Sequence, residues 1–374
     1  MCIAVKKSLL NCHVFKLMQA IIEQYKTAIC TAAEHKTPLQ ICGGGTKHFY
    51  GNPVTVQSDT LLDATMYNGI IDYEPTELVI TARAGTRLVD LEAVLDQKGQ
   101  MLAFEPPGFG VAATLGGCIA AGLSGPRRAA AGAVRDFVLG VRLLDGKGGD
   151  LRFGGQVMKN VAGYDVSRLM AGSMGTLGVL LEVSLKVLPK PSSEITLLMQ
   201  MDEAAAIEKM NQWAGKPLPI SATCYRNGVL FLRLSGAASA VRAAQLKLGG
   251  EELSEGEVFW KSVREQTHEF FQSADFLWRL SMKPTTPPLP LLGEQLMEWN
   301  GGLRWLLGNE NSDVAIIRKI AKDAGGHTTL FRSNEPGISV FHPLDPGMMK
   351  IHCALKEKFD PSGILNPGRL YPEI

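Results

Sequence analysis

The 374-residue sequence has no apolar run as long as the roughly 18 residues that a membrane-spanning helix needs. Its first residues, MCIAVKKSLLNCHVF, carry Lys6 and Lys7 among short apolar runs and no small-residue cleavage site, so we expect no signal peptide. Neither sign of charge is in excess, since 38 lysines and arginines oppose 37 aspartates and glutamates. With no basic stripe that carries aromatic residues, nothing here indicates binding to nucleic acid or to a membrane surface.

Paired cysteine motifs are also missing. The chain has seven cysteines, an odd number that cannot all pair with one another, and no two of them have the Cys-x-x-Cys spacing. This pattern argues against a disulfide framework and against a zinc or iron–sulfur site within the chain. We therefore expect no bound metal and a reducing, cytoplasmic environment.

Glycine and proline divide the chain. Glycine is dense from Gly43 to Gly178 and sparser afterwards, and a boundary is expected at LPKPSS, residues 188–193. The segment KPTTPPLPLLG, residues 283–293, contains four prolines, which exclude a regular helix or a central strand. In the first part, apolar spacing predicts a helix over 14–35 and a second over 86–98 with Thr86 as its N-cap.

The predicted pattern of helices and strands changes after residue 194. From there to about residue 250 the predicted order is strand, helix, a hairpin that turns at Asn227-Gly228, and a second helix. This order is typical of a ferredoxin-type unit, and equally of a generic α+β insertion.

Three glycine-rich segments carry the chemistry. In ICGGGTK, residues 41–47, three glycines can turn successive backbone N–H groups into a phosphate-binding concavity, although a plain turn explains them as well. Residues 105–126 are mostly small, which permits either close approach to a flat ligand or tight packing between elements. In residues 159–189, glycines precede a strand, as they also do in an ordinary loop before a hairpin. The Walker and Rossmann glycine patterns are both absent.

Together, the order and spacing of these segments resemble the FAD-binding domain of the vanillyl-alcohol oxidase superfamily, the type shared with p-cresol methylhydroxylase (PCMH). The tail FDPSGILNPGRLYP, residues 359–372, is similar to that of superfamily members that act on 2-hydroxy acids. Segments such as PPGFGVAATLGGCIAAGLSGPRR and GGQVMKNVAGYDVSRLMAGSMGTLGVL resemble in particular the FAD-binding E subunits of bacterial glycolate oxidase.

This resemblance implies an α+β fold. It comprises an N-terminal helix at 1–35, a two-subdomain PCMH-type FAD-binding domain at 36–190, a smaller α+β cap domain at 191–340, and a C-terminal segment at 341–374 that returns to the FAD domain.

The resemblance also implies roles for individual residues. The FAD pyrophosphate would be cradled by the backbone of Gly43, Gly44, Gly45 and Thr46. The pyrophosphate and the ribityl chain would lie beside Pro107, Gly108, Thr114, Gly116 and Gly117. The isoalloxazine would be approached by Gly122, Ser124 and Gly125, the adenine by the main chain of Gly178 and Val179, and the flavin by Arg369. Cys42 stands where relatives often have arginine.

FAD is expected to be bound non-covalently. The attachment histidine of covalent relatives stands near the position of Gly43 or Gly44, so we interpret His48 as a surface or packing residue.

Catalytic residues are harder to predict. Oxidation of a 2-hydroxy acid needs a cation for the carboxylate and a base for the hydroxyl proton. Catalytic relatives carry a histidine-rich motif in the cap, and in this chain only GGHTTLFR, residues 325–332, is weakly similar to it. Weak candidates are Arg279, His327 and Arg332, followed by His342 and His352.

The tryptophans and arginines of FLWRLSMKP and EWNGGLRWLLG could line a flavin-facing cavity or form a subunit interface. Enrichment of these residue types at interfaces, together with the missing histidine motif, favours a subunit interface or an incomplete pocket.

The resemblance implies an FAD-dependent oxidoreductase that acts on the CH–OH group of 2-hydroxy acids as a subunit of a glycolate oxidase (glycolate dehydrogenase) complex. Its partners would be a catalytic FAD subunit and an iron–sulfur subunit that receives electrons through flavin as glycolate becomes glyoxylate. The complex would lie in the cytoplasm, either free or peripherally associated with the membrane. A stand-alone 2-hydroxy-acid dehydrogenase and a non-catalytic structural flavin subunit are the alternatives.

Overall fold

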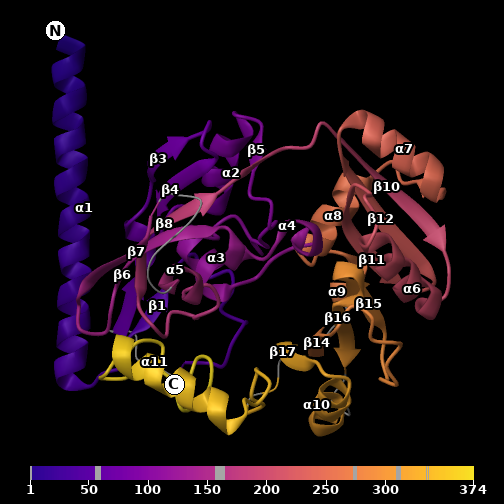
Figure 1. The fold of residues 1–374 in the computed structure, drawn as a ribbon. Coiled ribbons are helices and arrows are strands. Elements are labelled where there is room, and N and C mark those ends of the chain that lie inside the picture. The colour runs from indigo at the N-terminus through magenta and orange to yellow at the C-terminus, as the bar shows by residue number, and fades with distance from the viewer. Residues whose placement is uncertain are drawn as a thin grey trace.

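The computed structural model describes residues 2–54, 60–155, 165–272, 276–308, 313–333, 335 and 337–374, with side chains from residue 15 onward. Two β-sheets lie side by side, and the C-terminal segment runs beneath both (Figure 1). Parts of the predicted segment 159–189 lie outside the described residues.

Helix α1 (Cys2–His35) flanks the first sheet (Figure 1). Its residues Ile22, Tyr25 and Ile29 follow helical spacing and are buried against Leu181 and Leu365. The predicted helix over 14–35 thus forms the C-terminal part of a longer helix.

The first sheet is antiparallel, with strand order β3-β4-β8-β6-β7. Its strands are β3 (Ile70–Glu74), β4 (Val79–Arg83), β6 (Val138–Leu144), β7 (Asp150–Gly154) and β8 (Val179–Lys186). Two small ladders accompany it: β1 (Gln40–Cys42) pairs in parallel with β2 (Leu61–Asp63), and β5 (Gln100–Met101) pairs with β9 (Leu188–Pro189). Short helices are α4 (Arg128–Ala131), α5 (Val166–Leu169), η2 (Ala64–Met66) and η3 (Val134–Asp136).

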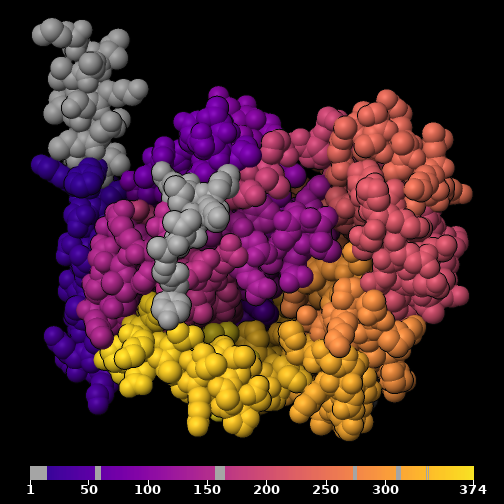
Figure 2. All heavy atoms as spheres, in the orientation of Figure 1, coloured from indigo at the N-terminus to yellow at the C-terminus, as the bar shows by residue number. Residues whose placement is uncertain are grey.

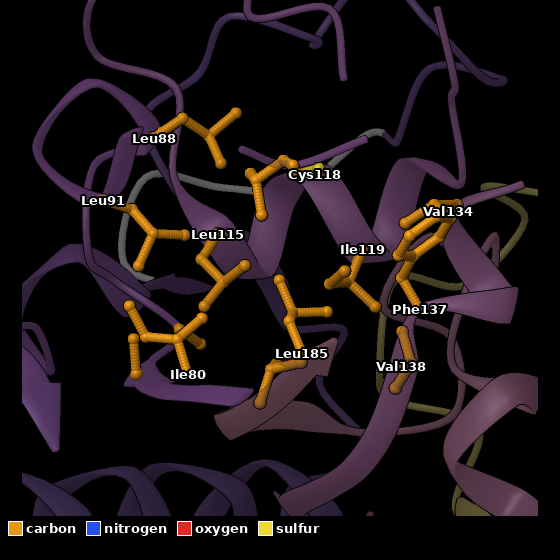
Figure 3. Close-up of a cluster of buried hydrophobic side chains, with 14 of the residues drawn as sticks. Ile80, Leu88, Leu91, Leu115, Cys118, Ile119, Val134, Phe137, Val138 and Leu185 are labelled. Atoms are coloured by element: carbon orange, nitrogen blue, oxygen red, sulfur yellow. The ribbon is translucent and has the colours of Figure 1, made fainter. Parts of the chain in front are cut away.

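Helices α2 (Leu88–Asp96) and α3 (Leu115–Ala121) pack on this sheet and form its main core. Figure 3 shows Leu91 and Leu115 directed at Ile80, while Ile119 lies near Val138. Each such side chain stabilises the fold by about 1.5–3 kcal/mol through burial.

The predicted N-cap of α2 is wrong. The helix starts after Arg87, which makes no side-chain cap, and the hydroxyl of Thr86 accepts the N–H of Gly69 at 2.9 Å instead. Thr86 thereby ties the helix entry to the loop before β3.

The second sheet begins with the predicted order of elements. These are β10 (Ser193–Gln200), α6 (Glu203–Ala214), β11 (Ile220–Arg226), β12 (Val229–Gly236), α7 (Ala238–Leu248) and β13 (Glu251–Glu252). The spatial order β13-β10-β12-β11 is that of a ferredoxin-type unit. Asn227 and Gly228 both have positive φ at the hairpin, as this turn requires.

The same sheet continues from β11 through β15, β16, β14 and β17. These strands are β14 (Phe276–Ser281), β15 (Gln295–Glu298), β16 (Leu303–Gly308) and β17 (His327–Ser333), accompanied by α8 (Gly256–Arg264), α9 (Glu269–Gln272), α10 (Val314–Asp323) and η4 (Trp299–Gly301). The proline-rich segment 283–293 contains neither helix nor strand.

The C-terminal segment contains α11 (Pro346–Phe359) and then returns to the first part. Figure 2 shows it along one edge of the molecule, from the side of α1 to the second sheet. Asn366 fixes its end, because its side chain accepts the N–H of Ile41 at 2.8 Å and donates to the carbonyl of Met174 at 2.7 Å.

Buried charges join the two sheets. Glu105, in the loop after β5, pairs with Arg127 at 3.2 Å and with Arg233 of β12 at 2.9 Å. Arg127 also reaches Glu194 of β10 at 2.6 Å, so ion pairs cross the junction in both directions. Trp299 adds a hydrogen bond from Nε1 to the carbonyl of Gly125 at 3.0 Å.

Candidate functional site

The glycine loop after β1 presents a run of free donors. The N–H groups of Gly44, Gly45, Thr46 and Lys47 donate no hydrogen bond to any residue that the structure describes. Gly45 has φ +72°, a left-handed conformation that glycine adopts without steric cost. Successive N–H groups in such a turn form a concavity that binds anions, phosphate above all.

Backbone packing shows why this loop requires glycine. A Cβ atom on Gly44 would lie 1.5 Å from the carbonyl oxygen of Ala112, and one on Gly43 would lie 2.4 Å from Thr114 Oγ1. Thr46 Oγ1 donates to the carbonyl of Gly108 at 2.7 Å and closes the contact from the other side. The loop therefore packs closely on residues 108–114, and the Thr46 hydroxyl bonds it to Gly108.

A groove runs along this loop. At one end it is lined by His48 and Arg369, and at the other by Gly178 and Leu180, with Met174 and Asn366 along its length. Nine residues predicted to contact the dinucleotide line it: Gly43, Gly44, Gly45, Thr46, Thr114, Gly116, Gly117, Gly178 and Arg369.

The start of α3 lines the groove but offers it no free backbone N–H group. The N–H of Leu115 is bonded to Thr86 O and that of Gly116 to Ala84 O, while the N–H of Gly117 is capped by Thr114 Oγ1 at 3.3 Å. These groups are unavailable to a phosphate. Phosphate contacts at this part of the groove therefore have to come from other elements, and the glycine loop offers the longest run of free N–H groups in the described part of the chain that lines it.

Arg369 lies in the groove wall, but its guanidinium is already used. Nη2 donates to the carbonyls of Tyr50 at 2.6 Å, His48 at 2.9 Å and Lys47 at 3.4 Å, and Nη1 donates to that of Asn52 at 2.8 Å. The predicted flavin neighbour therefore acts as a clamp on residues 47–52.

The segment around Gly108 is held from the second sheet. Glu265, which follows α8, accepts the N–H groups of Gly108 at 3.0 Å and Phe109 at 2.8 Å. Lys47 Nζ donates to Gly108 O at 3.2 Å, and burial lowers the pKa of Lys47. Gly108, predicted to run beside the ligand, does not line the groove, and its N–H and carbonyl are both engaged.

Two further predicted contacts lie away from the groove. Gly122 ends α3 at φ +68°, where a Cβ would meet the backbone of Gly172 at 2.8 Å, so it serves close packing. Val179 does not line the groove and its side chain is buried in the cluster that contains Ile22 and Ile29 of α1, so its expected main-chain contact with the adenine stays a prediction. His48 lines the groove and approaches Cys42 Sγ at 3.2 Å.

A second, small cavity lies where the sheets meet. It has a volume of about 20 Å³, and Pro107, Ser124 and Gly125 line it from the first part of the chain. From the second part come Arg279 and Glu298, among others. A volume of this size has room for about one water molecule.

Of the weak catalytic candidates, only Arg279 lines this cavity. It makes no hydrogen bond or ion pair with any described residue, its guanidinium stands 5.3 Å from the ring centre of Trp299, and burial lowers its pKa. Burial and then the charge of Arg279 lower the pKa of His327. Arg332 does not line the cavity, and its guanidinium donates to the side chain of Gln266, a lining residue, at 2.9 Å.

Glu298 was not among the predicted residues. It is 4% exposed, its Oε1 accepts the N–H of Trp305 at 2.8 Å, and burial raises its pKa to about 7 against the opposing effects of Trp305 and Arg279. A pKa near neutrality suits a group that exchanges protons. In the sequence, a lone glutamate before a tryptophan gave no signal of this environment.

Of the two alternatives for the tryptophans and arginines, the subunit interface is wrong, whereas Arg279 and Trp305 line the small cavity, as expected for an incomplete pocket. Trp278, Trp299, Trp305 and Arg304 are all at least 95% buried within the chain. Arg304 donates to the carbonyls of Thr286, Pro287 and Gly301 and so holds the proline-rich segment in place.

Comparison with known proteins identifies the family and the cofactor. A family model described as an FAD binding domain matches residues 20–154, which include the glycine loop and α3. The chain is 49% identical over 356 residues to the glycolate oxidase subunit GlcE of Escherichia coli (strain K12), covering 95% of this chain and 98% of that protein. The free N–H groups and the groove fit a dinucleotide, and FAD is the cofactor of this chain.

Other relatives match over less of their length or share only the fold. The glycolate oxidase subunit GlcD of Bacillus subtilis (strain 168) is 32% identical over 199 residues, which cover 53% of this chain and 42% of that protein. An alkyldihydroxyacetonephosphate synthase structure superposes with a TM-score of 0.63 at 17% identity over 92% of this chain and 74% of that one. No helix in the described part of the chain is long and apolar enough to cross a membrane.

Proposed function

The chain belongs to the family of the glycolate oxidase subunit GlcE, and from this premise we propose that it is the FAD-binding subunit of a glycolate oxidase complex. The complex oxidises glycolate to glyoxylate, with a catalytic FAD subunit and an iron–sulfur subunit as partners. Electrons pass through the flavin of this chain on their way to the iron–sulfur subunit.

The glycine loop holds the pyrophosphate of FAD. Four N–H donors, from Gly44 to Lys47, would replace the water around the two phosphates, and hydrogen bonds to a charged acceptor contribute about 1.5–3 kcal/mol each. Thr114 and Gly117 leave room for the chain of the cofactor, the adenine lies toward Gly178, and the isoalloxazine lies toward Ser124 and Gly125. When bound, FAD supplies the redox chemistry, and the protein supplies position and electrostatics.

The similarity to GlcE along nearly the whole chain carries the choice of a partner-dependent role. GlcE is a glycolate oxidase subunit, and the two chains are 49% identical over 95% of this one. The histidine-rich motif expected of catalytic relatives is also missing from the sequence. These observations support oxidation of glycolate on the partner subunit.

A stand-alone 2-hydroxy-acid dehydrogenase is the second candidate. Arg279 has no ion-pair partner among the described residues, and Glu298 lies in the same cavity, so a carboxylate-holding cation and a proton acceptor are both at hand.

One experiment separates these functions. The purified chain is reconstituted with FAD, its visible spectrum is recorded, and glycolate is added without oxygen, first to the chain alone and then with its partner subunits. We expect a flavin spectrum that bleaches only when the partners are present. Bleaching of the chain alone would establish the stand-alone dehydrogenase, and a protein that stays colourless would refute FAD binding.

A further inference from the structure

His48 stands at the glycine loop with its imidazole in the groove. It is exposed, and it lines the same stretch of the groove as Gly44, Gly45 and Thr46. A Cβ atom on Gly45 would lie 3.2 Å from Cδ2 of His48 and 3.4 Å from its Nε2, so this edge of the ring lies against the loop. The imidazole is therefore a neighbour of the free N–H groups from Gly44 to Lys47.

Backbone hydrogen bonds and one side chain hold His48 in this place. Its N–H donates to the carbonyl of Gly45 at 3.2 Å, and its carbonyl accepts from Arg369 at 2.9 Å. Nε2 lies 3.2 Å from Sγ of Cys42, and that thiol donates to the carbonyl of Gly43 at 3.1 Å. Nδ1 makes no hydrogen bond with any residue that the structure describes. The ring is thus fixed at one nitrogen and open to a ligand at the other.

The groove beside His48 has room for a diphosphate. This stretch has a volume of about 100 Å³, whereas a single water needs roughly 10–15 Å³. Several waters therefore fit against the free N–H groups, and the oxygens of a diphosphate can replace them. Because backbone donors are neutral, a charge that balances the diphosphate has to come from side chains.

Three basic side chains lie near His48. Arg369 donates to carbonyls between residues 47 and 52. Arg332 of β17 stands over the ring of Phe49, 5.3 Å from its centre. Lys47 Nζ donates to a backbone carbonyl at 3.2 Å, and burial lowers the pKa of Lys47. Lys47 is thus the basic neighbour whose charge can also respond to pH.

The acidic neighbours leave a charge on His48 unpaired. Burial and then Asp63 raise the pKa of the Cys42 thiol, so it stays uncharged at neutral pH. Asp63 accepts the N–H and the hydroxyl of Thr65 at 2.8 and 2.7 Å. Within the described part of the chain His48 has no ion-pair partner, so a positive charge on its ring is available to an anionic ligand.

We propose that His48, in its protonated form, holds the diphosphate of FAD and makes cofactor binding depend on pH. The inference rests on the proposed function, because it takes the diphosphate to lie at the glycine loop. An imidazole changes its charge between about pH 5 and 8, whereas a diphosphate diester keeps two negative charges throughout that range. FAD should therefore bind more tightly as the pH falls, and its binding near neutral pH should take up a proton from solvent.

The test measures the FAD dissociation constant of the full chain by equilibrium dialysis from about pH 5.5 to about pH 8.5. The wild type should bind FAD about tenfold more tightly at the lower end, which corresponds to about 1.4 kcal/mol for one charge-assisted contact. In His48→Gln the dissociation constant should change less than about twofold over this range. His48→Lys, which carries a fixed charge, should bind FAD tightly at both ends.

Two further ligands locate the effect at the diphosphate. ADP-ribose keeps the diphosphate diester without the flavin, so its affinity should follow the same pH dependence as that of FAD. Adenosine lacks phosphate, so its affinity should not respond to His48→Gln. The matched control is His35→Gln, because His35 is exposed at the end of α1 and does not line the groove, and this variant should keep the wild-type pH dependence.

Titration calorimetry in two buffers of different ionisation enthalpy provides a second readout. The wild type should take up a fraction of a proton for each FAD bound at neutral pH, and His48→Gln should take up less than half as much.

The outcomes are distinct. A His48→Gln protein that keeps both the pH dependence and the proton uptake overturns this inference, points to Lys47 as their source, and leaves the proposed function intact. A wild-type affinity that does not change with pH overturns it as well, as does an equal effect of His48→Gln on ADP-ribose and adenosine. A chain that binds neither FAD nor ADP-ribose at any pH overturns the proposed function together with the inference.

Discussion

Replacing Arg369 with methionine tests how the C-terminal segment holds the phosphate-binding loop. The guanidinium donates to four carbonyls between residues 47 and 52, at distances from 2.6 to 3.4 Å. Methionine keeps much of the side-chain volume but donates nothing. Hydrogen bonds from a charged donor contribute about 1.5–3 kcal/mol each, but carbonyls near the surface can turn to water, so we expect a total loss of about 3–5 kcal/mol.

The same substitution should weaken FAD binding. Once residues 47–52 lose their clamp, the four free N–H groups no longer converge, and every 1.4 kcal/mol of lost order costs a factor of ten in affinity. We expect at least a tenfold rise in the FAD dissociation constant of Arg369→Met. Arg369→Lys, which keeps the charge but not the planar fork, should fall between the variant and the wild type.

The assay is urea unfolding of the apoprotein together with equilibrium dialysis of FAD. Arg242→Met serves as the control, because Arg242 is exposed on α7 and has no assigned contact in the described part of the chain. The reasoning is refuted if Arg369→Met loses less than about 1 kcal/mol of unfolding free energy, or if it loses stability while FAD affinity stays unchanged.

Three further predictions concern FAD retention and pH. Gly44→Ala should abolish FAD absorbance, whereas Gly155→Ala, where a Cβ meets nothing within 4 Å, should retain it in the same purification. Glu105→Gln should cost about 3–5 kcal/mol near neutral pH by leaving Arg233 without its buried partner. Burial raises the pKa of Glu105, but its two arginines lower it by more, so the folded-state pKa lies below the usual value. Wild-type stability should therefore fall as the pH drops through that lowered pKa, and urea titrations of the variant should lack this fall. Burial raises the pKa of Glu298 to about 7, so the free energy of unfolding should fall as the pH rises from about 4 to 7. At 1.36 kcal/mol per pKa unit the loss is about 3–4 kcal/mol, and the Glu298→Gln variant should not show it.

Local patterns explain what could be predicted from the sequence. The turn at Asn227 and Gly228, the helices that follow β10 and β12, and the glycine loop all depend on residues that are neighbours in the chain. The order strand, helix, hairpin, helix allows few compact arrangements, so the ferredoxin-type order could be anticipated. Three consecutive glycines pointed to this loop, because Gly44 permits a close backbone approach and Gly45 adopts a positive φ, and glycine tolerates both.

Contacts between distant segments explain what was missed. Glu265 lies 157 positions after Gly108, and nothing in its surroundings indicates that it caps that backbone. The first N–H groups of helix α3 donate to the carbonyls of Ala84 and Thr86, because the helix packs against the loop after β4. Of the tryptophans that suggested an interface, Trp299 and Trp305 lie at the junction between two parts of the same chain, and Trp278 packs in the core of the second sheet.

The junction between the sheets also bears on where the substrate reacts. To admit glycolate beside Ser124, the second sheet would have to move away from the loop that contains Gly125, which breaks the pair of Arg233 with Glu105 and the hydrogen bond from Trp299. Breaking one buried pair costs about 3–5 kcal/mol and the hydrogen bond about 1 kcal/mol more. At 1.4 kcal/mol per factor of ten, the open form would be rarer than about one molecule in a thousand. The isoalloxazine needs more room than glycolate, so placing the ring beside Ser124 and Gly125 requires the same separation of the sheets, and the free energy of FAD binding has to supply its cost.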